Sequence, residues 1–145
     1  MKFQNILIPD NPLEEIKKLS DNKNLYLMPF DINDLLSSPP DTVKNIDRAN
    51  YKRCTTWFSD PVRITAAMIY PPTGGMGWHT NSDLAGHCVY LSWSETGDSG
   101  MGWLNEDGTV RRDYDSPGWN IRVFDVPQWH CVFANCWRCS VGVKP

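Results

Sequence analysis

Two of the three histidines in this 145-residue chain, His79 and His130, each directly follow a tryptophan, and the second is soon followed by Arg138-Cys139-Ser140. Two imidazoles could bind one metal ion. On a β-strand, residues two apart lie on one face, so Arg138 and Ser140 would point the same way. Together they suit one carboxylate group, which would be held by a guanidinium and a hydroxyl. These residue types predict a metal beside a carboxylate-binding pocket, a combination suited to oxygen activation.

This arrangement resembles the signature of the Fe(II)- and 2-oxoglutarate-dependent oxygenases, an H-x-D motif followed by a distal histidine and then by R-x-S. The likeness spans residues 62 to 143. It implies that His79 and His130 are catalytic iron ligands and that Arg138 and Ser140 hold the 5-carboxylate of 2-oxoglutarate. Tyr70, which precedes a Pro- and Gly-rich turn before His79, resembles a tyrosine of the nucleic-acid demethylase branch. It is expected to hydrogen-bond the cosubstrate.

The chain departs from this signature at the carboxylate ligand, where Asn81 stands in place of aspartate. A site with two histidines and one carboxylate leaves iron positions open for cosubstrate and oxygen, and the carboxylate cancels part of the metal's charge. Asn81 could still ligate through its amide oxygen. Asp83 could instead supply the charge if the turn after Asn81 folds it back. The third alternative is a weakened or absent iron site.

The elements that would position these residues are short strands separated by turns from residue 61 onward. Strand-like segments cover residues 62–70, 88–93 and 119–126, and Asp107-Gly108 predicts a hairpin between 101–104 and 109–114. Segments 130–133 and 137–143 are expected to pair through Ala134-Asn135-Cys136. The pattern predicts a mainly β protein, and the resemblance makes it a double-stranded β-helix, a cupin-like jelly roll, over 61–145.

Residues 1–60 predict a short α-containing N-terminal extension packed on this barrel. Strands are expected over 3–8 and 25–30, a helix after Asn11-Pro12, a short helix capped near Asp31, and a weaker helix over 45–58. At 145 residues and 41% hydrophobic content, residues 1–145 are expected to form a single domain with its own core.

Charge and cysteine content limit the classes of partner and the cellular compartment that we expect. The formal net charge of −3 argues against a general nucleic-acid surface, so a small-molecule or peptide substrate is expected. The first residues lack the apolar run of a secretory signal, and no segment is apolar enough to span a membrane. Five cysteines without a signal predict thiols in a reducing cytoplasm, which also suits ferrous iron. The sequence sets no oligomeric state.

Several side chains can be assigned a direction from strand alternation. Arg138 lies in an apolar strand, and because a buried guanidinium is costly without an anion, we expect an internal anionic partner. Tyr90, Ser92 and Ser94 share one face of their strand, and Leu91 and Trp93 share the other. Either the polar face lines a cavity, or Leu91 and Trp93 face the core and the polar face meets water. Arg122 could also face inward. The tryptophans beside the two ligand histidines are expected to pack in the core, and His87 is expected to be structural or substrate-facing.

Three functions follow from these residues. The first is an Fe(II)- and 2-oxoglutarate-dependent dioxygenase that hydroxylates its substrate and releases succinate and CO2. The second is a cupin-like metal- or ligand-binding barrel without turnover, which Asn81 favours. The third is a protein with a structural zinc site at Cys131, Cys136 and Cys139, together with His130.

Overall fold

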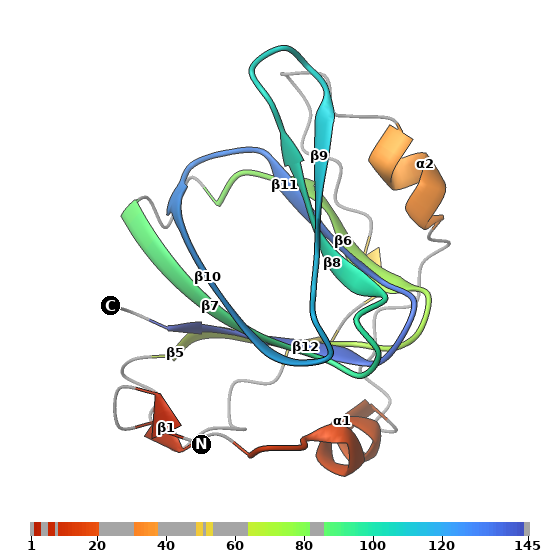
Figure 1. The fold of residues 1–145 in the computed structure, drawn as a ribbon, viewed down its shortest axis with the longest axis vertical. Coiled ribbons are helices and arrows are strands. Elements are labelled where there is room, and N and C mark those ends of the chain that lie inside the picture. The colour runs from red at the N-terminus through yellow and green to blue at the C-terminus, as the bar shows by residue number, and fades with distance from the viewer. Residues whose placement is uncertain are drawn as a thin grey trace.

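The computed structural model describes residues 2–3, 6–7, 9–20, 31–37, 49–50, 52–53, 64–81 and 86–143. Two antiparallel sheets of five strands each face one another (Figure 1). The helices are α1 (Leu13–Ser20) and α2 (Ile32–Ser37). The strands are β1 (Lys2–Phe3), β2 (Ile6–Leu7), β3 (Ala49–Asn50), β4 (Lys52–Arg53), β5 (Ile64–Tyr70), β6 (Gly74–His79), β7 (Gly86–Ser94), β8 (Ser99–Leu104), β9 (Val110–Tyr114), β10 (Gly118–Val126), β11 (His130–Ala134) and β12 (Arg138–Val143).

The strand order makes this fold a jelly roll. One sheet has the order β10-β7-β12-β5-β4 and the other has the order β3-β6-β11-β8-β9. From β5 to β12 the chain passes from one sheet to the other after nearly every strand, and only β8 and β9 are consecutive neighbours within a sheet. Double-sheet jelly rolls bury their core between the two sheets. The predicted fold class is confirmed.

The strands that carry His130 and Arg138 are not partners. β11 pairs with β6 and β8, whereas β12 pairs with β5 and β7 in the facing sheet. The predicted hairpin through residues 134–136 is therefore wrong: this connection crosses between sheets instead of reversing within one. His130 and Arg138 consequently approach the interior from opposite sheets.

The hairpin predicted at Asp107-Gly108 is confirmed between β8 and β9. Gly108 has a φ of 86°, a conformation that favours glycine. The Asp107 side chain accepts hydrogen bonds from the backbone N–H and the hydroxyl of Thr109, which fixes the turn.

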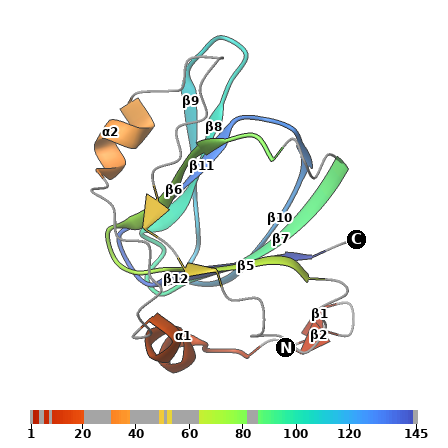
Figure 2. The ribbon, with the colours of Figure 1, turned by 180° about the vertical axis from the view of Figure 1, so that it is seen from behind.

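The two helices cover the outer faces of the two sheets (Figures 1 and 2). α1 begins after Asn11, whose side chain accepts a hydrogen bond from the Leu13 N–H, and it packs Ile16 against Trp93 and Cys139. α2 begins after Asp31, whose carboxylate accepts hydrogen bonds from two N–H groups of the first turn. Its buried leucines, Leu35 and Leu36, pack in one cluster with Trp78, Cys131 and Phe133. Both predicted helix starts are confirmed.

The segment before the barrel core corrects one prediction. The helix expected over 45–58 is wrong where the structure describes it, because β3 and β4 lie there. β3 pairs with β6 and β4 pairs with β5, so these short strands extend one sheet each. Edge pairing overrides the weak local helix pattern. The strand predicted over 25–30 lies outside the described residues, and the strand predicted over 3–8 is interrupted where β1 and β2 pair.

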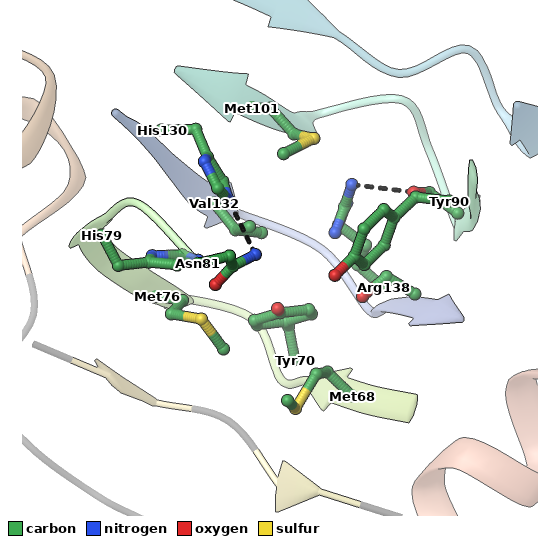
Figure 3. A pocket seen from close by; sticks show the side chains of 12 residues that line it. Met68, Tyr70, Met76, His79, Asn81, Tyr90, Met101, His130, Val132 and Arg138 are labelled. Carbon is green, nitrogen blue, oxygen red and sulfur yellow. Dashed lines mark hydrogen bonds between the residues drawn. The ribbon is translucent and has the colours of Figure 1, made fainter. Parts of the chain in front are cut away.

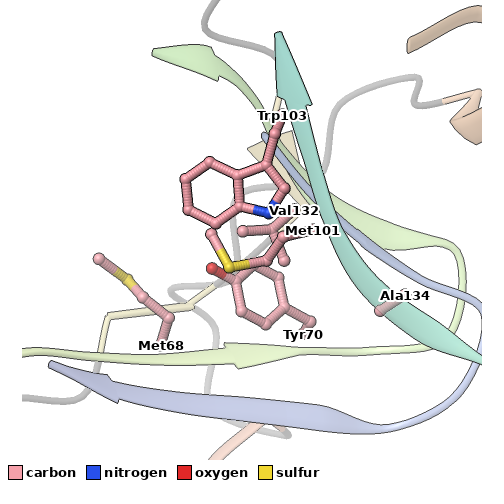
Figure 4. Close-up of a cluster of buried hydrophobic side chains, with 6 residues drawn as sticks. All are labelled: Met68, Tyr70, Met101, Trp103, Val132 and Ala134. Atoms are coloured by element: carbon pink, nitrogen blue, oxygen red, sulfur yellow. The ribbon is translucent and has the colours of Figure 1, made fainter. Parts of the chain in front are cut away.

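The interior between the sheets contains both a packed cluster and a cavity. Figure 4 shows the buried cluster of Met68, Tyr70, Met101, Trp103, Val132 and Ala134, whose members come from strands of both sheets.

The two helices also bear on the question of a membrane. In the described part of the chain, neither helix is long and apolar enough to cross a membrane.

Candidate functional site

The site begins with the two histidines that the sequence singled out. His79 is the last residue of β6 and His130 is the first residue of β11, and they lie directly opposite each other in the antiparallel register. Their ring centroids are 4.2 Å apart, and Figure 3 shows both side chains at one end of a cavity. Cross-strand partners project to the same face of a sheet, so strand pairing alone brings the rings together.

Backbone carbonyls fix how each ring is protonated. Nδ1 of His79 lies 2.6 Å from the Gly77 carbonyl oxygen, and Nδ1 of His130 lies 2.7 Å from that of Gln128. A carbonyl only accepts hydrogen bonds, so each Nδ1 carries a proton and donates it, and Nε2 is the atom that a neutral ring offers to a metal. Burial, and then the nearby His79, lower the pKa of His130 to about 3. At neutral pH His130 is therefore uncharged, which is the form that binds a metal.

Asn81 lies beside this pair. Its φ of 55° is in the left-handed region that asparagine tolerates, and its Nδ2 is 3.4 Å from His130 Nε2. Amide nitrogen and oxygen exchange places when the side chain turns by half a rotation, so the same position can present an oxygen to a cation. Asn81 thus offers a third possible metal ligand, a neutral amide oxygen. The alternative ligand, Asp83, lies outside the described residues.

The cavity beside these side chains encloses about 440 Å³, part of it open to solvent. Its walls are mostly apolar and include Met68, Met76, Met101 and Val132. The remaining lining residues are Tyr70, His79, Asn81, Tyr90, Ser92, His130, Arg138 and Ser140. The cavity therefore brings together all the described residues that the sequence analysis named for metal and cosubstrate binding.

Arg138 is almost wholly buried, with 1% of its surface exposed. Its Nε donates to Asp115 Oδ2 at 2.8 Å and its Nη2 donates to Ser92 Oγ at 3.1 Å. The expected internal anion is thus Asp115, which lies in the connection between β9 and β10 and which sequence reasoning missed. Nη1 has no hydrogen-bond partner among the described residues. Nε and Nη2 of the guanidinium are therefore hydrogen-bonded within the protein, and the N–H groups of Nη1 remain available to a ligand.

Asp115 belongs to a larger buried cluster. Arg122 donates to Asp115 Oδ1 at 2.5 Å and to Asp113 Oδ2 at 2.8 Å, so its side chain turns toward these carboxylates and is absent from the cavity wall. Burial raises the pKa of Asp115, but the charge and hydrogen bond of Arg138 outweigh it and bring that pKa to about 2. The sequence shows only that Asp113 and Asp115 are alternate positions at the end of β9, and their meeting with Arg122 and Arg138 follows from the two-sheet topology.

Three further side chains lie at this end of the cavity. Ser140 shares a face with Arg138 and lines the cavity, and Tyr70 pairs with Arg138 in register and also lines it. On β7 the two alternatives are resolved, because Ser92 faces the cavity while Leu91 and Trp93 are buried. The alternative in which the serine face meets water is wrong: the helix side of the sheet takes Trp93.

The zinc alternative is not supported by the placement of the thiols. Cys131 packs in the cluster that contains α2, Cys139 packs in the cluster that contains α1, and Cys136 contacts the Ser94 hydroxyl. Among the described residues no group of three or more His, Cys, Asp or Glu side chains is arranged to hold a metal. Alternation along the strands explains this, since neighbouring positions face opposite sides of a sheet.

The remaining histidine, His87, and the two tryptophans that precede His79 and His130 do not line the cavity. His87, near the start of β7, is exposed and pairs with Asp125 of β10. Trp78 is buried and donates a hydrogen bond from its indole N–H to the Leu35 carbonyl at 2.9 Å, while Trp129 packs against the same cluster. The expected core packing of these tryptophans is confirmed.

Comparisons with known proteins add information on the fold alone. No protein-family model and no curated protein sequence matches the chain. Among solved structures it is similar to the crystal structure of a cupin domain from Bordetella pertussis Tohama I, with a TM-score of 0.44 and 16% sequence identity. The match covers 70% of this chain and 100% of that domain. Identity at this level carries no activity from one protein to the other.

Proposed function

We propose that this protein is an Fe(II)- and 2-oxoglutarate-dependent oxygenase whose reaction takes place in the cavity between the sheets. The observation that carries the proposal is the cross-strand pair of His79 and His130, with ring centroids 4.2 Å apart and each Nδ1 at hydrogen-bond distance from a backbone carbonyl. Two imidazoles on one cavity wall are a typical beginning of a mononuclear metal site.

The donor set at this end fits a divalent ion. His79 and His130 would bind it through Nε2, and the Nδ1 hydrogen bonds to Gly77 and Gln128 would hold both rings in orientation. Asn81 would add a neutral oxygen. When bound, Fe(II) and 2-oxoglutarate supply oxygen activation coupled to the release of succinate and CO2. Because His130 is uncharged at neutral pH, metal binding there displaces no proton.

The opposite end fits a carboxylate through one donor group. Arg138 Nη1 is buried at the cavity wall with no hydrogen-bond partner among the described residues, and a buried donor without an acceptor is costly. Ser140 and Ser92 line the same wall and can contribute hydroxyl groups. Because Asp115 already neutralises Arg138, a bound carboxylate would be held by directed hydrogen bonds more than by net charge.

The substrate class follows from the cavity. Three methionines and Val132 form apolar walls of the cavity, and no Asp, Glu or Lys lines it among the described residues. We infer a small molecule, or one side chain of a peptide, that presents an uncharged group to the metal. The net charge of −3 does not favour nucleic acid.

Anaerobic addition of Fe(II) and 2-oxoglutarate tests the proposal, because their chelate gives a weak visible charge-transfer band. Wild-type protein is expected to show the band and His130→Ala to lose it. His87→Ala is the matched control, because His87 is exposed and lies outside the cavity. A missing band in wild type, or the same band in wild type and His130→Ala, would contradict the proposal.

A metal-binding barrel without turnover is the second candidate, and the neutral Asn81 favours it. Both candidates bind the ion, so binding does not separate them. Succinate formation under oxygen, measured with and without small-molecule and peptide substrates, does. Metal binding through His130 without any succinate would establish the second candidate.

A further inference from the structure

We propose that Asp115 is a positioning residue that holds the Arg138 guanidinium so that Nη1 is presented to a carboxylate in the cavity. The inference rests on the proposed function, in which Arg138 binds the anionic end of a ligand. Asp115 does not line the cavity and acts only through Arg138. It lies in the connection between β9 and β10, so this assignment links an element outside the cavity to ligand binding.

The contacts of Asp115 leave it little freedom. Oδ2 accepts hydrogen bonds from Arg138 Nε at 2.8 Å and from Ser99 Oγ at 2.6 Å, and Oδ1 accepts one from Arg122 Nη1 at 2.5 Å. Ser99 has a single hydroxyl proton, which it gives to Asp115, so the 2.7 Å contact between Ser99 and Ser94 is donated by Ser94. Both carboxylate oxygens are therefore engaged by other side chains.

These contacts determine which part of the guanidinium remains available. Nε is bound by Asp115 and Nη2 by Ser92, and two such bonds fix both the plane and the rotation of a planar group. Nη1 alone is buried without a partner, on a residue that lines the cavity. A carboxylate oxygen is the acceptor that matches this position, since charged acceptors make the strongest hydrogen bonds to guanidinium.

Charge balance separates positioning from simple attraction. The cluster contains two guanidinium groups and two carboxylates, from Arg138, Arg122, Asp115 and Asp113. If attraction alone held the ligand, removing the negative charge of Asp115 would strengthen anion binding. If Asp115 acts by orienting Arg138, the same change weakens it. The sign of the effect therefore decides between the two roles.

Succinate is a suitable probe, because it carries carboxylates but lacks the 2-oxo group, and it can be titrated into metal-free protein. We expect Asp115→Asn to bind succinate about tenfold more weakly than wild type, as the loss of one charge-assisted hydrogen bond predicts. Asp113→Asn is the matched control, because Asp113 contacts Arg122 but makes no bond to Arg138. Its succinate affinity is expected to stay near that of wild type.

Two further measurements exclude a merely structural effect. The ¹H–¹⁵N resonance of Arg138 Nε should move with succinate in wild type, and it should lose its protection from exchange in Asp115→Asn. Mn(II) affinity, measured in parallel, should be the same in wild type, Asp115→Asn and Asp113→Asn, since the histidine end is separate. If Asp115→Asn does not fold, Ser99→Ala replaces it, with a smaller but measurable weakening of succinate binding.

Equal or tighter succinate binding by the Asp115→Asn or Ser99→Ala variants would overturn the inference. Wild-type protein in which succinate leaves the Arg138 resonance unmoved would overturn it as well. The metal site of the proposed function is judged separately, by Mn(II) binding to wild type and its loss in His130→Ala. A protein that binds Mn(II) but not succinate thus refutes the role of Asp115 and leaves the metal site standing.

Discussion

The two ends of the cavity are built on opposite principles. At one end His79, His130 and Asn81 lie at the end of β6 and the start of β11, where they contact each other, backbone carbonyls and aromatic rings such as that of Trp103. At the other end Arg138 and Asp115 are charged, buried and joined to each other. At the histidine end a bound cation would supply positive charge, whereas at the arginine end the charges of Arg138 and Asp115 already balance each other. Stability should therefore depend on the arginine end, and metal affinity on the histidine end.

The largest effect is expected when the arginine end loses its central cation. Arg138→Met leaves Asp115 buried with Arg122 as its remaining ionic partner, and we expect a loss of about 3 kcal/mol in the free energy of unfolding. Urea denaturation measures it. His130→Ala in metal-free protein is the comparison, with an expected loss of about 1 kcal/mol, because the imidazole it removes is uncharged. Equal losses would remove the distinction between the two ends.

The histidine end should respond most to an added charge. Asn81→Asp places a carboxylate beside His130, and we expect Mn(II) or Fe(II) affinity to rise about a hundredfold, since attraction between opposite charges is strong in a partly buried site. Isothermal titration measures the change, with Asn81→Ser as the uncharged control. An unchanged affinity in Asn81→Asp would indicate that another residue supplies the acidic ligand, with Asp83 the first choice.

The contrast between the two ends also explains what the sequence could predict. The histidine end was accessible because its spacing matches a family signature and because short alternating strands predict a jelly roll. Asn81 stood out as the departure from that signature. Ser140 and Ser92 could be placed by alternation, a local property of a single strand.

The arginine end was harder because its partners are not local. Asp115 meets Arg138 only because β9, β10 and β12 belong to a particular two-sheet topology. Strand alternation gives the face of a residue but not the sheet that its strand joins, and the mistaken pairing of 130–133 with 137–143 had the same origin. An internal anion could be expected from the sequence, because a buried guanidinium needs an anionic partner. Which residue supplies that anion could be identified only from the fold.

Acid should weaken the arginine end in a defined window. The pKa of Asp115 is about 2 in the folded protein against an ordinary value of 3.8, so the folded state holds its proton less tightly than the unfolded state. The stability from this group is complete above pH 4 and is lost as pH falls toward 2, by about 2 kcal/mol. The difference in unfolding free energy between wild type and Asp115→Asn should shrink across this range. A constant difference would show that Asp115 is not held ionised.

The smallest effect is expected at the edge of the same cluster. The side chain of Asp113 is 34% exposed and that of Asp115 is fully buried, although both bind Arg122. Water can solvate a partly exposed carboxylate or its amide replacement, so Asp113→Asn should cost less than about 1 kcal/mol in urea denaturation. Asp115→Asn should cost more, because burial removes that solvation. If the two variants were equally destabilised, the cluster would act as one surface network, and the buried pair of Asp115 and Arg138 would have no separate role.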